Sequence, residues 1–309
     1  MREDWRPLTT PFNSLLLPTP PTYYAILLNS KKTLIPLSEL DRFLAEESTT
    51  GYKELREQFT HSSVGNYINA SYIGVCNTDV NGNVFVQESI ARPRFITTQD
   101  PLENTIGDFW KMVYEQRVPI IIRLLGPSEN KEETQKYWPQ GVDEKAPFPT
   151  TSGKMWVKLL YEERKPVWVE RSFRIWPDGQ RSLSMFVHHL EYVGWMTNCL
   201  SASTNLLKFI DDVTDPLVPI AATAGPMVVQ SRGGIGRNGL FVVASIIKEN
   251  VEMGAKGVDI YNIIKQLRSY QMGFVNSVDY YIELHYFALQ AYLQTKTGGC
   301  RQLQYKEIK

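Results

Sequence analysis

The spacing of apolar positions changes along the chain and predicts where strands and helices lie. Residues 120–125 (Ile-Ile-Ile-Arg-Leu-Leu) form an almost continuous apolar run, which is typical of a buried strand. Apolar residues return at helical spacing over residues 34–47, which favours an amphipathic helix there. On the same grounds we expect strands near 154–161, 166–175 and 183–193, and helices near 202–213, 239–251, 259–269 and 277–294.

Polar residues mark where several of these helices begin. Asp259 and Ser277 precede two of the helical stretches and are typical N-cap residues. Thr105 and Asp108 have the spacing of a capping box, and we expect them to open an amphipathic helix through residues 109–114. Strands and helices therefore alternate from residue 67 onward, as they do in a mixed α/β fold.

The chain is interpreted as one large domain. No internal repeat is visible, and no linker after residue 50 is long enough to separate two domains. Residues 1–33 are rich in proline and are expected to form an extended lead-in. We therefore place a single domain at residues 34–296, followed by a C-terminal tail at residues 297–309.

Composition narrows the classes of function. Lys plus Arg and Asp plus Glu both number 33, so there is no basic field for nucleic acid or an anionic membrane. No apolar run is long enough to span a membrane, and the first residues do not resemble a signal peptide. Three widely spaced cysteines argue for a reducing compartment, so we expect a cytoplasmic protein. Four scattered histidines lack metal-ligand spacing, so neither a metal nor a cofactor is expected, and His188-His189 is interpreted as structural.

The most informative segment is a glycine-rich turn between an apolar strand and a helix with Arg237 in its first turn. Backbone N–H groups of such a turn converge, and the helix N-terminus adds partial positive charge. An arginine there can bind an oxyanion with two hydrogen bonds. The segment therefore predicts a phosphate-binding cradle, formed by Ser231, Arg232, Gly233, Gly234, Ile235, Gly236 and Arg237.

Two other interpretations of this segment are weaker. Residues 234–239 spell G-x-G-x-x-G, the dinucleotide fingerprint, and Asp259 follows at a suitable distance. The motif lies in the last third of the chain, however, and Asp259 is expected to begin a helix instead of ending a strand. A tight strand–helix turn that binds no ligand is the second alternative.

Motifs spread along the chain resemble those of the tyrosine-specific protein phosphatase domain. NYINASYI at residues 66–73 is similar to that family's (D/N)YINASYI segment. Further similar stretches are FITTQDPLENT at 95–105 with Phe109-Trp110, YWP at 137–139, MGFVNS at 272–277 and a shortened YKEL…HSSV at 52–64. The resemblance covers about residues 40–295. It implies the tyrosine phosphatase fold, an α/β single domain with a highly twisted mixed β-sheet flanked by α-helices.

The same resemblance implies that residues needed for catalysis are replaced. Active members attack phosphotyrosine with a low-pKa cysteine in the motif H-C-x5-R-(S/T)-G. Here Gln230, Ser231 and Asn238 occupy the positions of the histidine, the cysteine and the hydroxyl residue, while Arg237 is kept. The family's water-positioning glutamine corresponds to Asn276.

The general acid of the family is replaced as well. Aligned through residues 188–192, its W-P-D loop corresponds to Trp-Met-Thr here, so that the hinge residue Trp195 remains and Thr197 takes the place of aspartate. Threonine cannot deliver a proton near neutral pH. A literal Trp-Pro-Asp-Gly at 176–179 lies where the family has a sheet hairpin, and we interpret it as a turn.

Residues that would bind phosphotyrosine are better kept. Beside Arg237, the resemblance places Tyr52 where the family stacks an aromatic ring on the substrate, and Glu54, next to Leu55, where an aspartate holds the substrate backbone. Glu133 stands where the family has a basic residue near the ring. The parts used for binding are thus more complete than the parts used for chemistry.

These features imply a catalytically inactive phosphatase-like domain, a pseudophosphatase, that shields or sequesters a tyrosine-phosphorylated protein such as a kinase. One alternative is a scaffold that binds no phosphate because Arg232 fills the cradle. Another is a weakly active phosphatase, or one disabled at a single site. The replacements are spread over many positions, with Arg232 for a small residue and Asp100 for a glycine, which favours the first interpretation.

Overall fold

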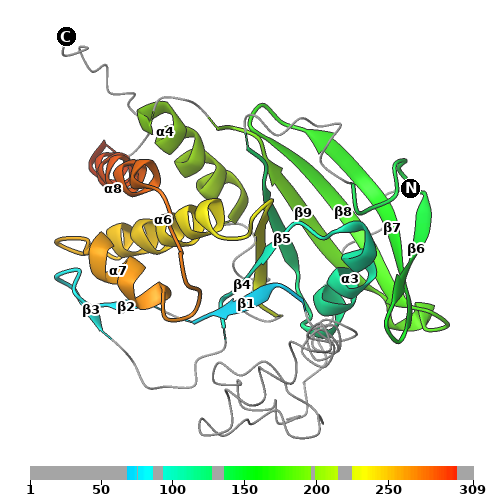
Figure 1. The fold of residues 1–309 in the computed structure, drawn as a ribbon. Helices are drawn as coiled ribbons and strands as arrows, with labels where there is room; N and C mark the ends of the chain where they lie inside the picture. The colour runs from blue at the N-terminus through cyan, green and yellow to red at the C-terminus, as the bar shows by residue number, and fades with distance from the viewer. Residues whose placement is uncertain are drawn as a thin grey trace, which may run out of the picture.

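The computed structural model describes residues 68–74, 76–85, 93–126, 136–195, 199–214 and 225–297. An eight-stranded sheet runs through these residues (Figure 1). In spatial order its strands are β1 (Ala70–Ile73), β4 (Phe95–Gln99), β10 (Met227–Ser231), β5 (Ile120–Leu124), β9 (Met185–Tyr192), β8 (Trp168–Pro177), β7 (Gly153–Arg164) and β6 (Lys145–Thr150). A separate small ribbon pairs β2 (Asn77–Thr78) with β3 (Val84–Phe85).

The sheet is mixed. Its middle strands β4, β10, β5 and β9 are parallel, whereas β1 on one side and β8, β7 and β6 on the other pair antiparallel. Parallel neighbours need crossover connections, and helices supply them between β4 and β5 and between β9 and β10. This mixed sheet with flanking helices confirms the α/β fold class that the sequence predicts.

Burial along the strands follows the pattern of the sequence. Every residue of β5 and of β10 is buried, because both strands lie in the middle of the sheet with helices or other strands over each face. The centre of β7 alternates between buried and half-buried residues. At the outer edge, β6 (Lys-Ala-Pro-Phe-Pro-Thr) exposes every second residue and contains Pro147 and Pro149.

Helices cover the two faces of the sheet unequally (Figure 1). The helices are α3 (Ile106–Glu115), α4 (Cys199–Phe209), α6 (Gly236–Glu252), α7 (Ile260–Leu267) and α8 (Val278–Thr297), with short helical turns η2 (Glu103–Thr105), η3 (Arg181–Leu183) and η4 (Ile210–Thr214). Helices α4, α6, α7 and α8 lie on one face, and α3 packs on the other, beside β6, β7 and β8.

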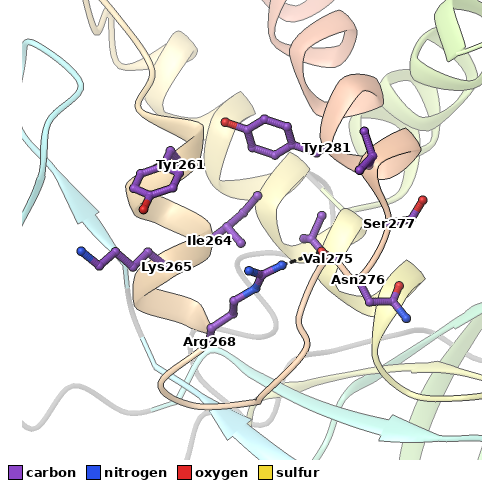
Figure 2. Close-up of a pocket in the computed structure, with 9 residues that line it drawn as sticks. Tyr261, Ile264, Lys265, Arg268, Val275, Asn276, Ser277 and Tyr281 are labelled. Atoms are coloured by element: carbon purple, nitrogen blue, oxygen red, sulfur yellow. Dashed lines mark hydrogen bonds between the residues drawn. The ribbon is translucent and has the colours of Figure 1, made fainter.

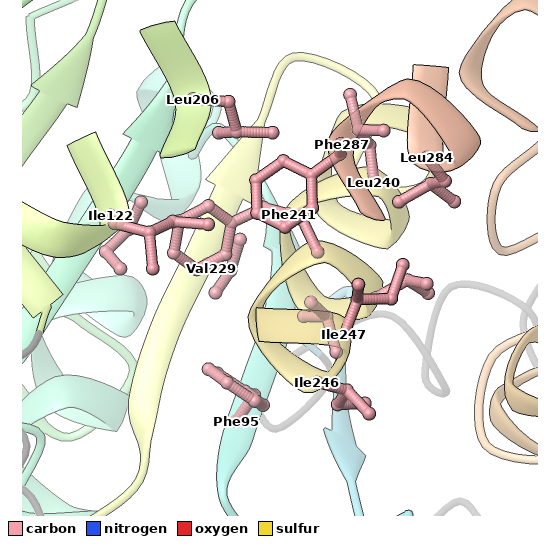
Figure 3. Close-up of a cluster of buried hydrophobic side chains, with 14 of the residues drawn as sticks. Phe95, Ile122, Leu206, Val229, Leu240, Phe241, Ile246, Ile247, Leu284 and Phe287 are labelled. Carbon is pink, nitrogen blue, oxygen red and sulfur yellow. The ribbon is translucent and has the colours of Figure 1, made fainter. Parts of the chain in front are cut away.

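Each face has its own hydrophobic core. In the larger one, Phe241 of α6 lies between the sheet and α8, with Val229 of β10 and Phe287 of α8 in the same cluster (Figure 3). The smaller core joins α3 to the antiparallel strands through Trp110, Tyr137 and other buried side chains. Because only the turn at residues 232–235 separates β10 from α6, the packing of both elements in the larger core fixes that turn.

All three predicted helix starts are confirmed, and two of the three predicted side-chain caps are formed. Asp259 precedes α7 and accepts a hydrogen bond from Asn262 N at 3.0 Å, so it does not end a strand as the dinucleotide interpretation requires. Ser277 precedes α8, and its hydroxyl accepts from Asp279 N at 3.1 Å. Thr105 directly precedes α3 as predicted, but its predicted side-chain cap is wrong, because its hydroxyl is bonded to Leu102 in the preceding turn.

The literal Trp-Pro-Asp-Gly sequence is a turn, as predicted. It lies where β8 ends at Pro177 and the chain turns towards β9. Gly179 has a positive φ of 71°, and Asp178 accepts a hydrogen bond from Trp156 Nε1 at 2.8 Å. The carboxylate of Asp178 is therefore part of the hairpin.

Some predictions fall outside the described residues: the proline-rich lead-in at 1–33, the helix at 34–47 and the C-terminal tail beyond residue 297. In the described part of the chain, no helix combines the length and the apolar character that crossing a membrane requires. The same residues contain no cluster of His, Cys, Asp and Glu that could hold a metal ion.

Candidate functional site

The candidate site lies at the edge of the sheet where the four parallel strands end. β10 ends at Ser231, and Asp100 follows β4 directly. Leu125 follows β5, and Trp195 lies three residues beyond the end of β9. Since the strands are parallel, these positions lie at the same edge, where ligands bind in open α/β sheets.

The predicted cradle is a tight loop between β10 and α6. Gly234 has φ of 72°, and its N–H donates to Ser231 O at 3.1 Å. A side chain at position 234 would meet Gln99 N at 2.7 Å, so glycine is needed both for the backbone angle and for the contact with β4. At Gly233 a Cβ would meet nothing within 4 Å, so this part of the loop borders open space.

Several backbone N–H groups of the cradle are not used within the fold. Among the described residues, no hydrogen bond is formed by the backbone N–H of Arg232, Gly233, Ile235 or Gly236. Two of these groups belong to the turn, and the other two lie at the N-terminus of α6, where the helix dipole is positive. Such a group of free donors is suited to an anion.

Asn238 ties the cradle to its surroundings. It is fully buried, and its Nδ2 lies within hydrogen-bond distance of Thr98 O, Val229 O and Gly234 O, at 2.9, 3.0 and 2.9 Å. The amide therefore links β4, β10 and the turn. The residue that replaces the family's hydroxyl has a structural role in this chain.

Arg237 and Arg232 are placed differently. Arg237 is half-buried and donates from Nη1 to Leu124 O at 2.8 Å, at the end of β5. Arg232 is exposed. The exposure of Arg232 argues against the alternative in which its guanidinium fills the cradle.

Gln230 belongs to a polar ladder that crosses the sheet beneath the cradle. Its Nε2 donates to Asp100 Oδ1 at 2.8 Å, and Asp100 in turn accepts from Arg123 Nε at 3.2 Å and Nη2 at 2.9 Å. Arg123 also donates to Glu191 at 3.0 Å, and Glu191 pairs with Arg171 at 3.5 Å. The ladder thus runs from β10 through β5 and β9 to β8.

Burial and charge set the protonation of this ladder. Burial alone would lower the pKa of Arg123, but the carboxylate of Asp100 and then that of Glu191 outweigh it, so the pKa is raised and the guanidinium stays charged. The pKa of His189 lies well below its ordinary value because the ring is buried and close to Arg171 and Arg123. His189 is therefore neutral, and its Nε2 is 2.8 Å from the hydroxyl of Tyr137.

The ladder was not predicted from the sequence, although one residue of the sequence indicated it. Arg123 is a single charge within the apolar run of 120–125, and a charge in a buried strand needs a partner. The sequence indicated only that Asp100 stands where the family has a glycine. Asp100 follows β4 and Arg123 lies in β5, and these two strands are not neighbours in the sheet because β10 lies between them.

Trp195 packs where the predicted acid loop leaves β9. Its ring lies against that of Tyr192, with centroids 5.1 Å apart. Close by, burial raises the pKa of Glu283 on α8 to about 7, and Glu283 adds to the burial that raises the pKa of Tyr192. Among the described residues, Trp195 Nε1, Tyr192 OH and Glu283 Oε1 are buried without a hydrogen-bond partner.

Asn276 borders the cradle from the turn before α8. A Cβ at Gly236 would lie 2.4 Å from Asn276 Oδ1, which places this side chain against the first residue of α6. Asn276 also lines a pocket of about 410 Å³ between α7 and the start of α8. Figure 2 shows Arg268 in this pocket, where Nη2 donates to Val275 O at 2.9 Å.

Other predicted site residues lie outside the described part of the chain. They are Thr197 of the acid loop, the recognition residues Tyr52, Glu54 and Leu55, and Glu133. The structure therefore brings together Gln230, the cradle, Asn238 and Asn276, with Trp195 at the same edge of the sheet.

Comparison with known proteins gives one family. The family described as Protein-tyrosine phosphatase matches residues 49–290. Receptor-type tyrosine-protein phosphatase V of Rattus norvegicus is 30% identical over 230 residues, which are 74% of this chain and 12% of the relative. Tyrosine-protein phosphatase non-receptor type 7 of Homo sapiens is 31% identical over 225 residues, which are 72% of this chain and 55% of the relative.

Tyrosine-protein phosphatase 69D of Drosophila melanogaster is 30% identical over 233 residues, which are 73% of this chain and 15% of the relative. The chain spans less than two thirds of the length of each of these relatives. The family match covers more than half of the chain and includes the cradle, the ladder and Trp195. The chain belongs to the protein-tyrosine phosphatase family.

Proposed function

We propose that this domain is a catalytically inactive member of the family that binds a tyrosine-phosphorylated protein and shields or sequesters its phosphate. The observation that carries the proposal is the cradle, in which the backbone N–H groups of Arg232, Gly233, Ile235 and Gly236 form no hydrogen bond within the described part of the chain. A phosphate dianion would receive hydrogen bonds from these groups and from Arg237, whose guanidinium lies at the end of the neighbouring strand.

The residues that would perform chemistry support the inactive assignment. Ser231 stands at the nucleophile position, is only 3% exposed, and has no base hydrogen-bonded to its hydroxyl within the described residues. A serine without such a base is a weak nucleophile. Gln230 and Asn238 are committed to structural hydrogen bonds, and Thr197 offers no proton to a leaving phenolate.

Two other functions are the alternatives. In a phosphate-independent scaffold the cradle would be filled, and the exposed position of Arg232 argues against that. A weakly active or single-site-disabled phosphatase would keep its general acid, and Thr197 argues against that. The partner is proposed to be a cytoplasmic signalling protein such as a kinase.

The proposal is tested by calorimetric titration with a phosphotyrosine peptide and its unphosphorylated twin. Hydrogen bonds to a charged group contribute about 1.5–3 kcal/mol each, so we expect at least a tenfold preference for the phosphorylated peptide. Arg237→Ala should remove the preference, whereas Arg164→Ala on β7, outside the cradle, should leave it unchanged. Equal affinity of the wild-type protein for both peptides would favour the scaffold.

A further inference from the structure

We propose that Asp100 and Arg123 are positioning residues that hold the cradle in its anion-binding shape before a ligand arrives. The inference rests on the proposed function, because a preformed cradle matters only to a protein that binds an anion. Neither side chain contacts the anion in this proposal. Both act through the first residues of the loop, Gln230 and Ser231.

Asp100 holds the start of the loop at two points. Its backbone N–H donates to Ser231 O at 2.9 Å, and its Oδ1 accepts from Gln230 Nε2 at 2.8 Å. The same Ser231 carbonyl accepts the N–H of Gly234, which closes the turn. A displacement of Asp100 would therefore move both the end of β10 and the first turn of the cradle.

Arg123 fixes Asp100 in turn. Its Nε and Nη2 bind the two carboxylate oxygens of Asp100 at 3.2 and 2.9 Å, which is a bidentate arrangement. Arg123 is 2% exposed, and its guanidinium lies 5.6 Å from the ring centroid of Tyr137 and 5.5 Å from that of Trp138. A planar group enclosed in this way has one orientation available to it.

The ladder anchors this pair to the antiparallel strands. Arg123 Nη1 contacts Glu191 at 3.0 Å, Glu191 contacts Arg171 at 3.5 Å, and Arg171 Nε donates to Glu162 at 2.5 Å. Successive charges alternate in sign along the ladder. The position of the cradle is thereby tied to β7 and β8, on the far side of the sheet.

Charge balance explains why a carboxylate is tolerated beside an anion site. An unpaired carboxylate at Asp100 would repel a phosphate bound in the adjacent cradle. Bidentate pairing with Arg123 cancels that charge locally, so Asp100 keeps its mechanical connection to the loop while the cradle keeps its attraction for an anion.

The family motif, as the resemblance places it here, does not contain the carboxylate of this pair. The resemblance places glycine at position 100, and a glycine provides the N–H to Ser231 but no carboxylate. It places histidine at position 230, where Gln230 now donates to that carboxylate. Two replacements that contact each other, with Arg123 completing them, replace the histidine as the support of the loop.

The test measures the loop without any ligand. In Asp100→Asn, Arg123 loses one of its two charged partners and keeps Glu191, while the side chain at position 100 keeps its size. We expect the N–H of Gly234 to exchange with solvent about tenfold faster by NMR, because its hydrogen bond to Ser231 O opens more often. Binding of tungstate, a phosphate-like oxyanion, should weaken about tenfold in the same variant.

A matched control separates positioning from general stability. Glu162→Gln removes the last charge of the same ladder, far from the cradle, and should leave Gly234 exchange and tungstate affinity within about twofold of wild type. Gln230→Met cuts the link to Asp100 without breaking the ion pair, and it should reproduce the cradle effect even if Asp100→Asn folds poorly. Unchanged Gly234 exchange in Gln230→Met, or equal effects in Glu162→Gln, would overturn the proposal. If the wild-type protein did not bind the phosphopeptide, that result would instead count against the proposed function.

Discussion

Two groups of buried polar side chains lie at the same edge of the sheet and differ in how they are satisfied. Beneath the cradle, Asp100, Arg123, Glu191 and Arg171 are all paired with an opposite charge. Behind Trp195, the buried polar atoms Tyr192 OH, Trp168 Nε1, Trp195 Nε1 and Glu283 Oε1 have no partner among the described residues.

The difference indicates which half of the site is constrained. A buried polar atom without a partner costs about 1–3 kcal/mol, so a region that contains several is not arranged for stability. In the family the cradle binds the phosphoryl group, whereas the loop that follows Trp195 supplies the acid. In this chain the binding half is connected by buried ion pairs that the half next to the acid loop lacks, although Gln230 Oε1 and Asn238 Oδ1 in the binding half also have no partner among the described residues.

The largest expected effect concerns chemistry. Ser231→Cys repairs only the connected half, so we expect no multiple turnover of an aryl phosphate, because Thr197 cannot protonate the leaving group and Asn276 positions water poorly. The comparison protein carries Ser231→Cys with Thr197→Asp, Gln230→His and Asn276→Gln. Turnover of about 1 s⁻¹ or more by the single variant would mean that the chain is an enzyme disabled at one position.

A smaller effect concerns the unpaired half and depends on pH. Burial raises the pKa of Glu283 in the folded protein to about 7 from 4.5, so the folded state keeps a proton that the unfolded chain has lost. Stability from this group is present below pH 4.5 and is lost as the pH rises to about 7. Glu283→Gln should therefore be more stable than wild type at pH 8, by at most about 3 kcal/mol, and similar to it at pH 4.

Urea unfolding at the two pH values checks this expectation. Asp279→Asn, on the exposed side of the same helix, is the control and should show the pH dependence of the wild type. If Glu283→Gln lost stability at pH 8, the carboxylate would have a partner there, and the contrast between the two regions would disappear.

The smallest effect compares two buried tyrosines, one in each region. The hydroxyl of Tyr137 is 2.8 Å from His189 Nε2, whereas the hydroxyl of Tyr192 has no partner among the described residues. Thermal unfolding should show that Tyr137→Phe lowers stability by about 1–2 kcal/mol, whereas Tyr192→Phe, which removes an unpartnered hydroxyl, should raise stability by about 1 kcal/mol. Equal costs would show that the Tyr192 hydroxyl is satisfied as well.

Local patterns in the sequence predicted most of the described elements. The apolar run at 120–125 became β5, and Asp259 and Ser277 cap the helices they precede. Thr105 also precedes the helix it was expected to open, but its hydroxyl bonds to Leu102 in the preceding turn and does not cap α3.

The candidate site, too, could be predicted from the sequence only in part. The cradle was visible because its residues are consecutive, and the family resemblance placed Asn276 and Trp195 at the same site. The ladder was not visible because its members come from five strands whose order in the sheet differs from their order in the sequence. Contacts across β10 between Asp100 and Arg123 require that order to be known.

The prolines of β6 have a consequence for how a partner can be recognised. β6 is the last strand of the sheet, and a proline has no N–H to offer to a further strand. With Pro147 and Pro149 in this short strand, an extended peptide cannot continue the hydrogen-bond ladder at this side. Strand addition is therefore disfavoured at β6, whereas β1, the strand at the opposite edge of the sheet, contains no proline and keeps its N–H groups.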